Sequence, residues 1–140
     1  MKSGLVAFYR KIRGSSLSPL GVALSVAVGL GVGLMPLYGM HWALVLLFCW
    51  PFRLDAALAF AATMISNPVT LPFLVALELE LGAKLVGASA LSPAHLIAGD
   101  GWSEAALQLA VGSSVLAIGV ALLGALIVWA AVRRWRRALA

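Results

Sequence analysis

The length of the uncharged stretches constrains this chain more than any other feature. No Asp, Glu, Lys or Arg occurs in residues 14–52, a run of 39 residues, or in residues 105–132, a run of 28 residues. A helix needs about 20 apolar residues to cross the hydrocarbon core of a bilayer. Because lipid cannot hydrogen-bond to an open backbone, runs of this length predict helices that satisfy their own backbone inside a membrane. The expected fold is therefore an all-α membrane protein.

Composition points to the same class. The chain has 140 residues, of which 63% are hydrophobic and 11% are charged, whereas a soluble domain is about half apolar and a quarter charged. A chain this small cannot bury so much apolar side chain in one aqueous core. The apolar stretch after the basic N-terminus continues well beyond the length of a signal peptide, so we expect residues 1–140 to be the mature chain.

The net charge of +5 is unevenly distributed along the chain. Eight of the ten Lys and Arg residues flank the apolar body: Lys2, Arg10, Lys11, Arg13, Arg133, Arg134, Arg136 and Arg137. Basic flanks are typical of the cytoplasmic boundary of a membrane protein and attract anionic lipid. We therefore expect a multi-pass protein of the cytoplasmic (inner) membrane, with both termini in the cytoplasm and no nucleic-acid partner.

A proline and a glycine divide the first uncharged stretch. Pro36 removes a backbone donor and Gly39 allows unusual backbone angles, which predicts one helix over 18–35 and a shorter one over 40–52. The shorter helix covers about 20 Å. This hairpin therefore either spans the membrane fully or forms a re-entrant arm.

A second break lies at Pro68 and Pro72, which cannot both sit inside a regular helix. It predicts a broken crossing helix with halves over 55–66 and 70–86. Asp55, just before the first half, is better interpreted as a helix N-cap than as part of a buried relay.

The chain is expected to form a single polytopic membrane domain over residues 1–140. Its segments are an amphipathic interfacial helix (1–16), a region with two helix breaks (17–87), an external loop (88–104), a transmembrane helix (105–132) and a basic tail (133–140). If both basic ends are cytoplasmic, the number of crossings is even. Arg53 then lies on the cytoplasmic side, and Glu78, Glu80 and Lys84 emerge at the opposite interface.

Small residues recur at every fourth position of the first predicted helix, at Gly21, Ser25, Gly29 and Gly33. Such a stripe lets another helix backbone approach closely. We interpret it as a helix-packing surface rather than as the wall of a transport pathway. Because a few short elements cannot bury two broken segments among themselves, the stripe also favours a homo-oligomer.

The two breaks lie 32 residues apart, with Pro36 and Pro68 in corresponding positions. Paired interruptions point to a mid-membrane binding site in transporters, because irregular backbone must be buried in protein or line a polar cavity. The candidate cavity comprises Pro36, Gly39, His41, Arg53, Asn67, Pro68, Thr70 and Pro72. The alternative that Asn67 and Thr70 only cap freed backbone groups stays open, and a lone His41 fits a hydrogen-bonded structural role better than that of a ligand.

The sequence contains no residue pattern that is typical of an enzyme active site. There is no nucleophile elbow, phosphate-binding loop or metal-ligand cluster, and Glu78 and Glu80, two apart on a helix, do not share a face. The single Cys49 excludes an internal disulfide and fits a small core side chain. We therefore expect no enzyme activity, no cofactor and no metal.

Several runs of residues together resemble one bacterial membrane family. They are Pro19 and Ala23, Gly29 to Gly33, Leu34-Met35-Pro36-Leu37-Tyr38-Gly39-Met40-His41, Arg53-Leu54-Asp55, Ile65-Ser66-Asn67-Pro68-Val69-Thr70-Leu71-Pro72 and Leu81-Gly82. Over residues 17–87 the chain resembles the uncharacterised family catalogued as domain of unknown function 2062. Asp55 stands where Asn is usual, and Tyr38 where a second Pro is common. The resemblance implies a multi-pass inner-membrane protein, sometimes attached to glycosyltransferase domains, without an established activity.

Two functions follow as hypotheses. The leading one is a small transporter-like or carrier-like protein for a cell-envelope solute or a lipid-linked species, with the candidate cavity as its site. The alternative is a non-transporting membrane scaffold, or an accessory subunit of an envelope glycosyltransferase-type enzyme.

Overall fold

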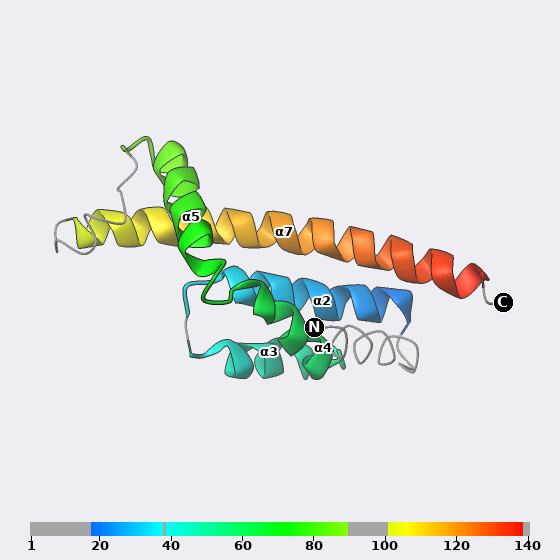
Figure 1. Cartoon of the computed structure of the whole chain (residues 1–140). Helices are drawn as coiled ribbons and strands as arrows, with labels where there is room; N and C mark the ends of the chain where they lie inside the picture. The colour runs from blue at the N-terminus through cyan, green and yellow to red at the C-terminus, as the bar shows by residue number, and fades with distance from the viewer. Residues whose placement is uncertain (1–17, 38, 90–100, 139–140) are drawn as a thin grey trace.

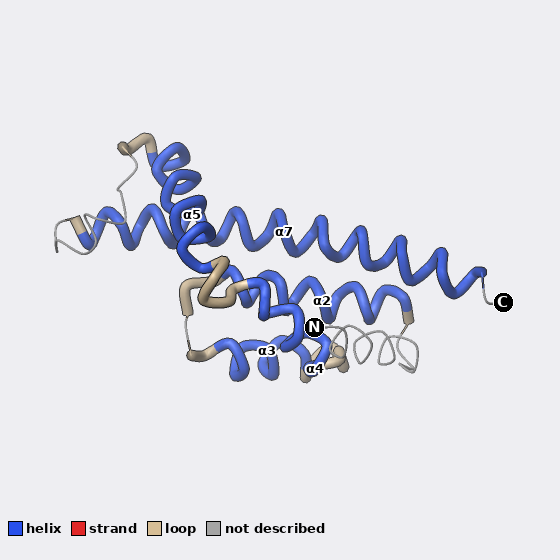
Figure 2. Tube along the Cα trace, viewed as in Figure 1, coloured by secondary structure: helices blue, strands red, loops and turns tan. Residues whose placement is uncertain are grey.

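The computed structural model describes residues 18–37, 39–89 and 101–138. Within these ranges the chain is helical, with five α-helices, one 3₁₀ turn and no strand (Figures 1 and 2). The predicted interfacial segment 1–16 and most of the predicted loop 88–104 lie outside the described residues.

The first described helix, α2 (Pro19–Leu34), begins where the sequence supplies a cap. The Ser18 hydroxyl accepts a hydrogen bond from the Gly21 N–H at 3.1 Å, and proline is favoured in the first turn because its missing donor is not needed there. The helix ends just before Pro36. After that break, α3 (His41–Cys49) is only 9 residues long, which corresponds to about 14 Å and is too short to cross a bilayer.

The second broken region begins with α4 (Ala56–Ala62) and continues as the 3₁₀ turn η1 (Thr63–Ile65). Asp55 Oδ1 accepts hydrogen bonds from the N–H groups of Ala57 and Leu58, both at 3.0 Å. The predicted N-cap role of Asp55 is thus confirmed. After the second break, α5 (Leu71–Val86) ends at Gly87, whose φ of 75° gives the left-handed C-cap that glycine favours.

The last helix, α7 (Trp102–Ala138), has 37 residues and is about 55 Å long. It extends beyond the predicted span 105–132 at both ends. Glu104 in its first turn and arginines in its last turn complement the helix dipole, so the end of the predicted loop and most of the predicted basic tail are helical. Among the described residues, α7 is the one helix long and apolar enough to cross a membrane.

Two groups of elements pack against helix α7 (Figure 1). Helix α2 lies along it in the antiparallel direction, with α3 and α4 packed against α2, whereas α5 crosses α7 steeply near its N-terminal end. Two buried clusters hold the α2 group together. One contains Val22, Val26, Leu58 and Val132, and the other contains Val32, Val45, Cys49 and Ala59.

Four of the described basic residues, Arg133, Arg134, Arg136 and Arg137, lie at the C-terminal end of α7. Leu58 and Val132 share a buried cluster, and the Asp55 N–H donates to the Ser25 hydroxyl at 2.9 Å. The turn that carries Arg53 therefore lies beside the middle of α2, on the same side of the α5 crossing as these arginines. At the opposite end, Lys84 on α5 forms an ion pair with Glu80.

Candidate functional site

The two helix breaks approach each other where α2 ends. The Ser66 hydroxyl donates a hydrogen bond to the Gly33 carbonyl at 2.5 Å. A Cβ placed on Gly33 would lie 3.0 Å from the Thr63 backbone and 3.2 Å from the side chain of Ile65. The end of α2 is therefore packed directly against η1 and the start of the second break.

A cavity of about 210 Å³ lies beside this contact. Its lining residues are Gly39, His41, Trp42, Phe60, Thr63, Met64 and Ser66. His41 Nε2 is 3.4 Å from the Met35 carbonyl oxygen, so the ring contacts the backbone of the first break. The Thr63 hydroxyl donates to the Phe60 carbonyl at 2.7 Å and is thereby turned toward its own helix.

Only two of the residues proposed for the cavity line it, namely Gly39 and His41. Ser66 belongs to the same Ser-Asn-Pro run as Asn67 and Pro68 and could have been included on that ground. Thr63 lies one turn earlier in an otherwise apolar segment, and nothing in the sequence marks it. The lining does not include Pro36, Arg53, Asn67, Pro68, Thr70 or Pro72.

Asn67 and Thr70 form a closed turn. Asn67 Oδ1 accepts hydrogen bonds from the Val69 N–H at 2.9 Å and the Thr70 N–H at 3.1 Å. Thr70 Oγ1 accepts from the Asn67 N–H at 3.0 Å and donates to the Ile65 carbonyl at 2.5 Å. Side chains of this type satisfy backbone groups that a turn leaves unpaired. These bonds are the capping pattern that the sequence left open as an alternative.

Arg53 lies away from the cavity, in the turn that joins α3 to α4. It sits in the exposed turn between α3 and α4 with a φ of 51°, and its N–H donates to the Trp50 carbonyl at 3.1 Å. This turn lies beside Ser25 in the middle of α2, whereas the cavity lies beside Gly33 at the end of α2. The structure therefore does not bring Arg53 to the cavity.

The small-residue stripe of α2 faces α4 and η1 of the same chain. Ser25 Oγ donates to the Gly21 carbonyl at 2.8 Å and accepts from Asp55 N–H. A Cβ on Gly29 would lie 2.0 Å from the Ala59 carbonyl oxygen. The partner in close contact with Ser25, Gly29 and Gly33 is thus the α4–η1 region of the same chain.

A second close crossing, between α5 and α7, was not predicted. A Cβ on Gly82 would lie 1.8 Å from the Gln108 carbonyl oxygen, and one on Gly112 would lie 1.8 Å from the Glu78 carbonyl oxygen. At each glycine the missing side chain thus leaves room for a backbone carbonyl of the other helix. The signal present in the sequence is a shared spacing, because each glycine follows a buried polar residue by four positions.

Glu78, which was expected at the interface opposite Arg53, is buried at this crossing. Its side chain is 2% exposed, and among the described residues its Oε2 has no hydrogen-bond partner. Two residues further along α5, exposed Glu80 accepts a hydrogen bond from Lys84 at 2.7 Å.

Gln108 completes the polar part of the crossing. Its side chain is fully buried, and its Nε2 donates to the Ser89 carbonyl at 3.1 Å. It also lies 3.4 Å from Glu104 Oε1. Within the described ranges, no group of three or more His, Cys, Asp or Glu side chains is placed to hold a metal ion.

Comparison with known proteins identifies a family. The model of the family described as an uncharacterized protein conserved in bacteria (DUF2062) matches residues 5–139. No curated protein and no solved structure matches the chain.

Proposed function

The chain belongs to this bacterial family, and we propose that it is a multi-pass protein of the cytoplasmic membrane that serves as a non-transporting scaffold or accessory subunit. The observation that carries the scaffold role is the closed turn at Asn67 and Thr70. Its side-chain oxygens are engaged by the chain's own backbone. A transport pathway needs polar groups that face a solute, whereas the side chains of Asn67 and Thr70 are bonded to nearby backbone groups.

The membrane arrangement is supported by the segregation of charge. The end at which α7 terminates carries four arginines, Arg133, Arg134, Arg136 and Arg137, and Arg53 lies on the same side of the α5 crossing. The positive-inside rule assigns such an end to the cytoplasm. Helix α2 then runs away from the cytoplasm, and α3 returns as a re-entrant arm because it is too short to span. The α4–η1 segment leads outward again to α5, so that α7 brings the chain back.

Cysteine labelling tests this topology. In a Cys49→Ser background, Ser89→Cys should react with a membrane-impermeant maleimide in intact spheroplasts, because Ser89 is exposed at the α5 end. Ala138→Cys, exposed at the basic end, should react only after the membrane is permeabilised. Labelling of Ala138→Cys in intact spheroplasts would contradict the proposed orientation.

A carrier for a small solute is the second candidate, and the cavity of about 210 Å³ beside His41 favours it. Pockets for drug-sized ligands are about 300–1,000 Å³, so any cargo of this cavity would have to be small. The cavity borders the first break through Gly39 and His41, which is one of the two places where the sequence predicted a binding site.

Variants of the turn and of the cavity separate the two candidates. Asn67→Asp and Thr70→Ser keep the oxygens that form the turn, so a scaffold should retain both its thermal midpoint and its ability to restore growth to a strain lacking the chain. A carrier that holds its solute in the cavity should also tolerate these two variants, but it should lose growth restoration in Met64→Phe, which adds bulk at a lining residue, while its folded amount in the membrane stays constant. A scaffold should tolerate Met64→Phe as well. Thr70→Val, which removes the oxygen, serves as the control for loss of the turn itself.

A further inference from the structure

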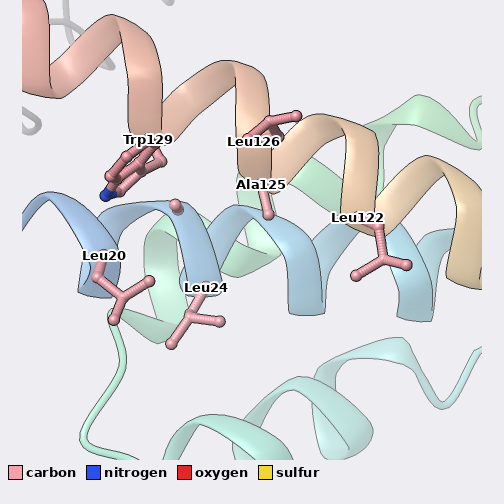
Figure 3. Close-up of a pocket in the computed structure, with 7 residues that line it drawn as sticks. Leu20, Leu24, Leu122, Ala125, Leu126 and Trp129 are labelled. Atoms are coloured by element: carbon pink, nitrogen blue, oxygen red, sulfur yellow. The ribbon is translucent and has the colours of Figure 1, made fainter.

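An apolar groove runs between α2 and α7. It has a volume of about 360 Å³, and Leu20, Leu24, Leu122, Ala125, Leu126 and Trp129 line it. Figure 3 shows Trp129 reaching from α7 toward α2 beside Leu20, at one end of the groove. The groove exists because alanines form its floor while exposed leucines form its rims.

The groove ends at the basic end of the molecule. Arg133, one turn beyond Trp129, places its guanidinium carbon 4.9 Å from the centre of the Trp129 ring, a cation–π contact that holds the charge at the mouth of the groove. Arg134 follows directly. From Arg133 to Ala138, the described end of α7 carries four arginines and no acidic residue.

We propose that this groove binds one acyl chain of an anionic phospholipid, whose phosphate is held by Arg133 and Arg134. The inference rests on the membrane embedding proposed above. From Leu122 to Trp129 the groove extends about 10 Å along α7, which fits within one leaflet of a hydrocarbon core about 30 Å thick. A guanidinium binds a phosphate through paired hydrogen bonds.

The shape and charge of the groove favour a lipid over the other occupants. A second copy that docks by the same face would bring its own Arg133 and Arg134 against these arginines, and like charges repel. Water would find almost no hydrogen-bonding partners among leucine and alanine side chains. An acyl chain is the apolar occupant that is narrow, flexible and connected to an anionic group of its own.

Native mass spectrometry of the full chain, released from nanodiscs containing equal amounts of phosphatidylglycerol and phosphatidylcholine, tests the proposal. We expect one retained phosphatidylglycerol per chain, at about fivefold or more over phosphatidylcholine, since one arginine near a membrane contributes about 1 kcal/mol to binding an anionic lipid. Arg133→Gln should reduce this preference about fivefold without changing the fold. Lys84→Gln, which removes a positive charge from the opposite end, should leave the preference unchanged.

Filling the groove provides the second arm. Ala125→Phe should abolish retention of the lipid, whereas Gly119→Phe adds the same bulk where a Cβ meets no atom within 4 Å and should retain it. Equal retention of both lipids by the parent chain, equal loss in the two Phe variants, or a dimer that Ala125→Phe dissociates would each overturn the proposal. Resistance to alkaline carbonate extraction is scored separately, so that failure of membrane embedding is distinguished from failure of the lipid site.

Discussion

The crossing of α2 with α4 and the crossing of α5 with α7 use the same steric device in different surroundings. In each, a glycine receives a backbone carbonyl, from Ala59 at Gly29 and from Glu78 at Gly112. The first crossing is apolar except for hydroxyls that donate to nearby carbonyls. The second encloses the carboxyl group of Glu78, one of whose oxygens has no hydrogen-bond partner among the described residues. Close backbone approach therefore dictates where helices meet, but it does not require that the contact be apolar.

This difference should appear in how the two crossings respond to change. An apolar contact depends on shape alone and should be indifferent to pH. An unsatisfied buried polar atom destabilises a fold by about 1–3 kcal/mol, so the α5–α7 crossing is retained despite an unfavourable group. We expect both crossings to be sensitive to added volume and only the second to be sensitive to protonation.

The largest effect is expected at Gly112. In Gly112→Leu the new Cβ would lie 1.8 Å from the Glu78 carbonyl oxygen, and neither backbone can yield without separating α5 from α7. We expect a loss of about 4 kcal/mol in the free energy of unfolding, at the upper end of overpacking effects. Urea unfolding in detergent, followed by circular dichroism, measures it. Gly119→Leu has no atom within 4 Å of its Cβ and should unfold like the parent; equal losses in both variants would show that the crossing is not tightly packed.

A somewhat smaller effect is expected at Gly29. Its Cβ would meet the Ala59 carbonyl oxygen at 2.0 Å, but α4 is a seven-residue helix that can shift more easily than α5. Gly29→Leu should therefore lower the free energy of unfolding by about 3 kcal/mol. The matched control is Gly31→Ala in the same helix, whose Cβ makes an ordinary contact at 3.7 Å with Ala121. If Gly29→Leu were as stable as Gly31→Ala, the α2–α4 crossing would not depend on close backbone approach, contrary to our expectation.

Protonation of Glu78 should distinguish the two crossings directly. Glu78 is buried between α5 and α7, and one of its oxygens has no hydrogen-bond partner within the described residues, so its neutral form is the more stable one in the folded chain. The free energy of unfolding should therefore decline as pH rises. Thermal midpoints measured between pH 5 and pH 8 test this. Glu78→Gln should remove the decline, whereas Glu80→Gln, at an exposed ion pair, should leave it in place.

How far the sequence predicted these features depends on whether a signal lies within one helix or between two. The small-residue stripe repeats along α2 and was visible, but nothing in the alanine-rich segment 56–62 marks it as the partner. Gly82 and Gly112 lie on separate helices, and their role requires knowing that α5 crosses α7. The Asp55 cap is local and was predicted. The lining of the cavity depends on the fold of η1 and was largely missed.

The smallest effect is expected at Thr70, in the turn that joins the two crossings. Thr70→Val keeps the shape of the side chain but removes the oxygen that accepts from Asn67 N–H and donates to the Ile65 carbonyl. We expect a loss of about 1 kcal/mol, as for other side-chain caps of backbone groups, measured by urea unfolding in detergent. Thr70→Ser keeps the oxygen and should match the parent. Because the turn holds η1 against α2 and positions α5 on α7, the loss in Thr70→Val should be smaller when Gly29→Leu or Gly112→Leu has already loosened its neighbour. A loss that adds fully in both double variants would show that the two crossings are independent of the turn between them.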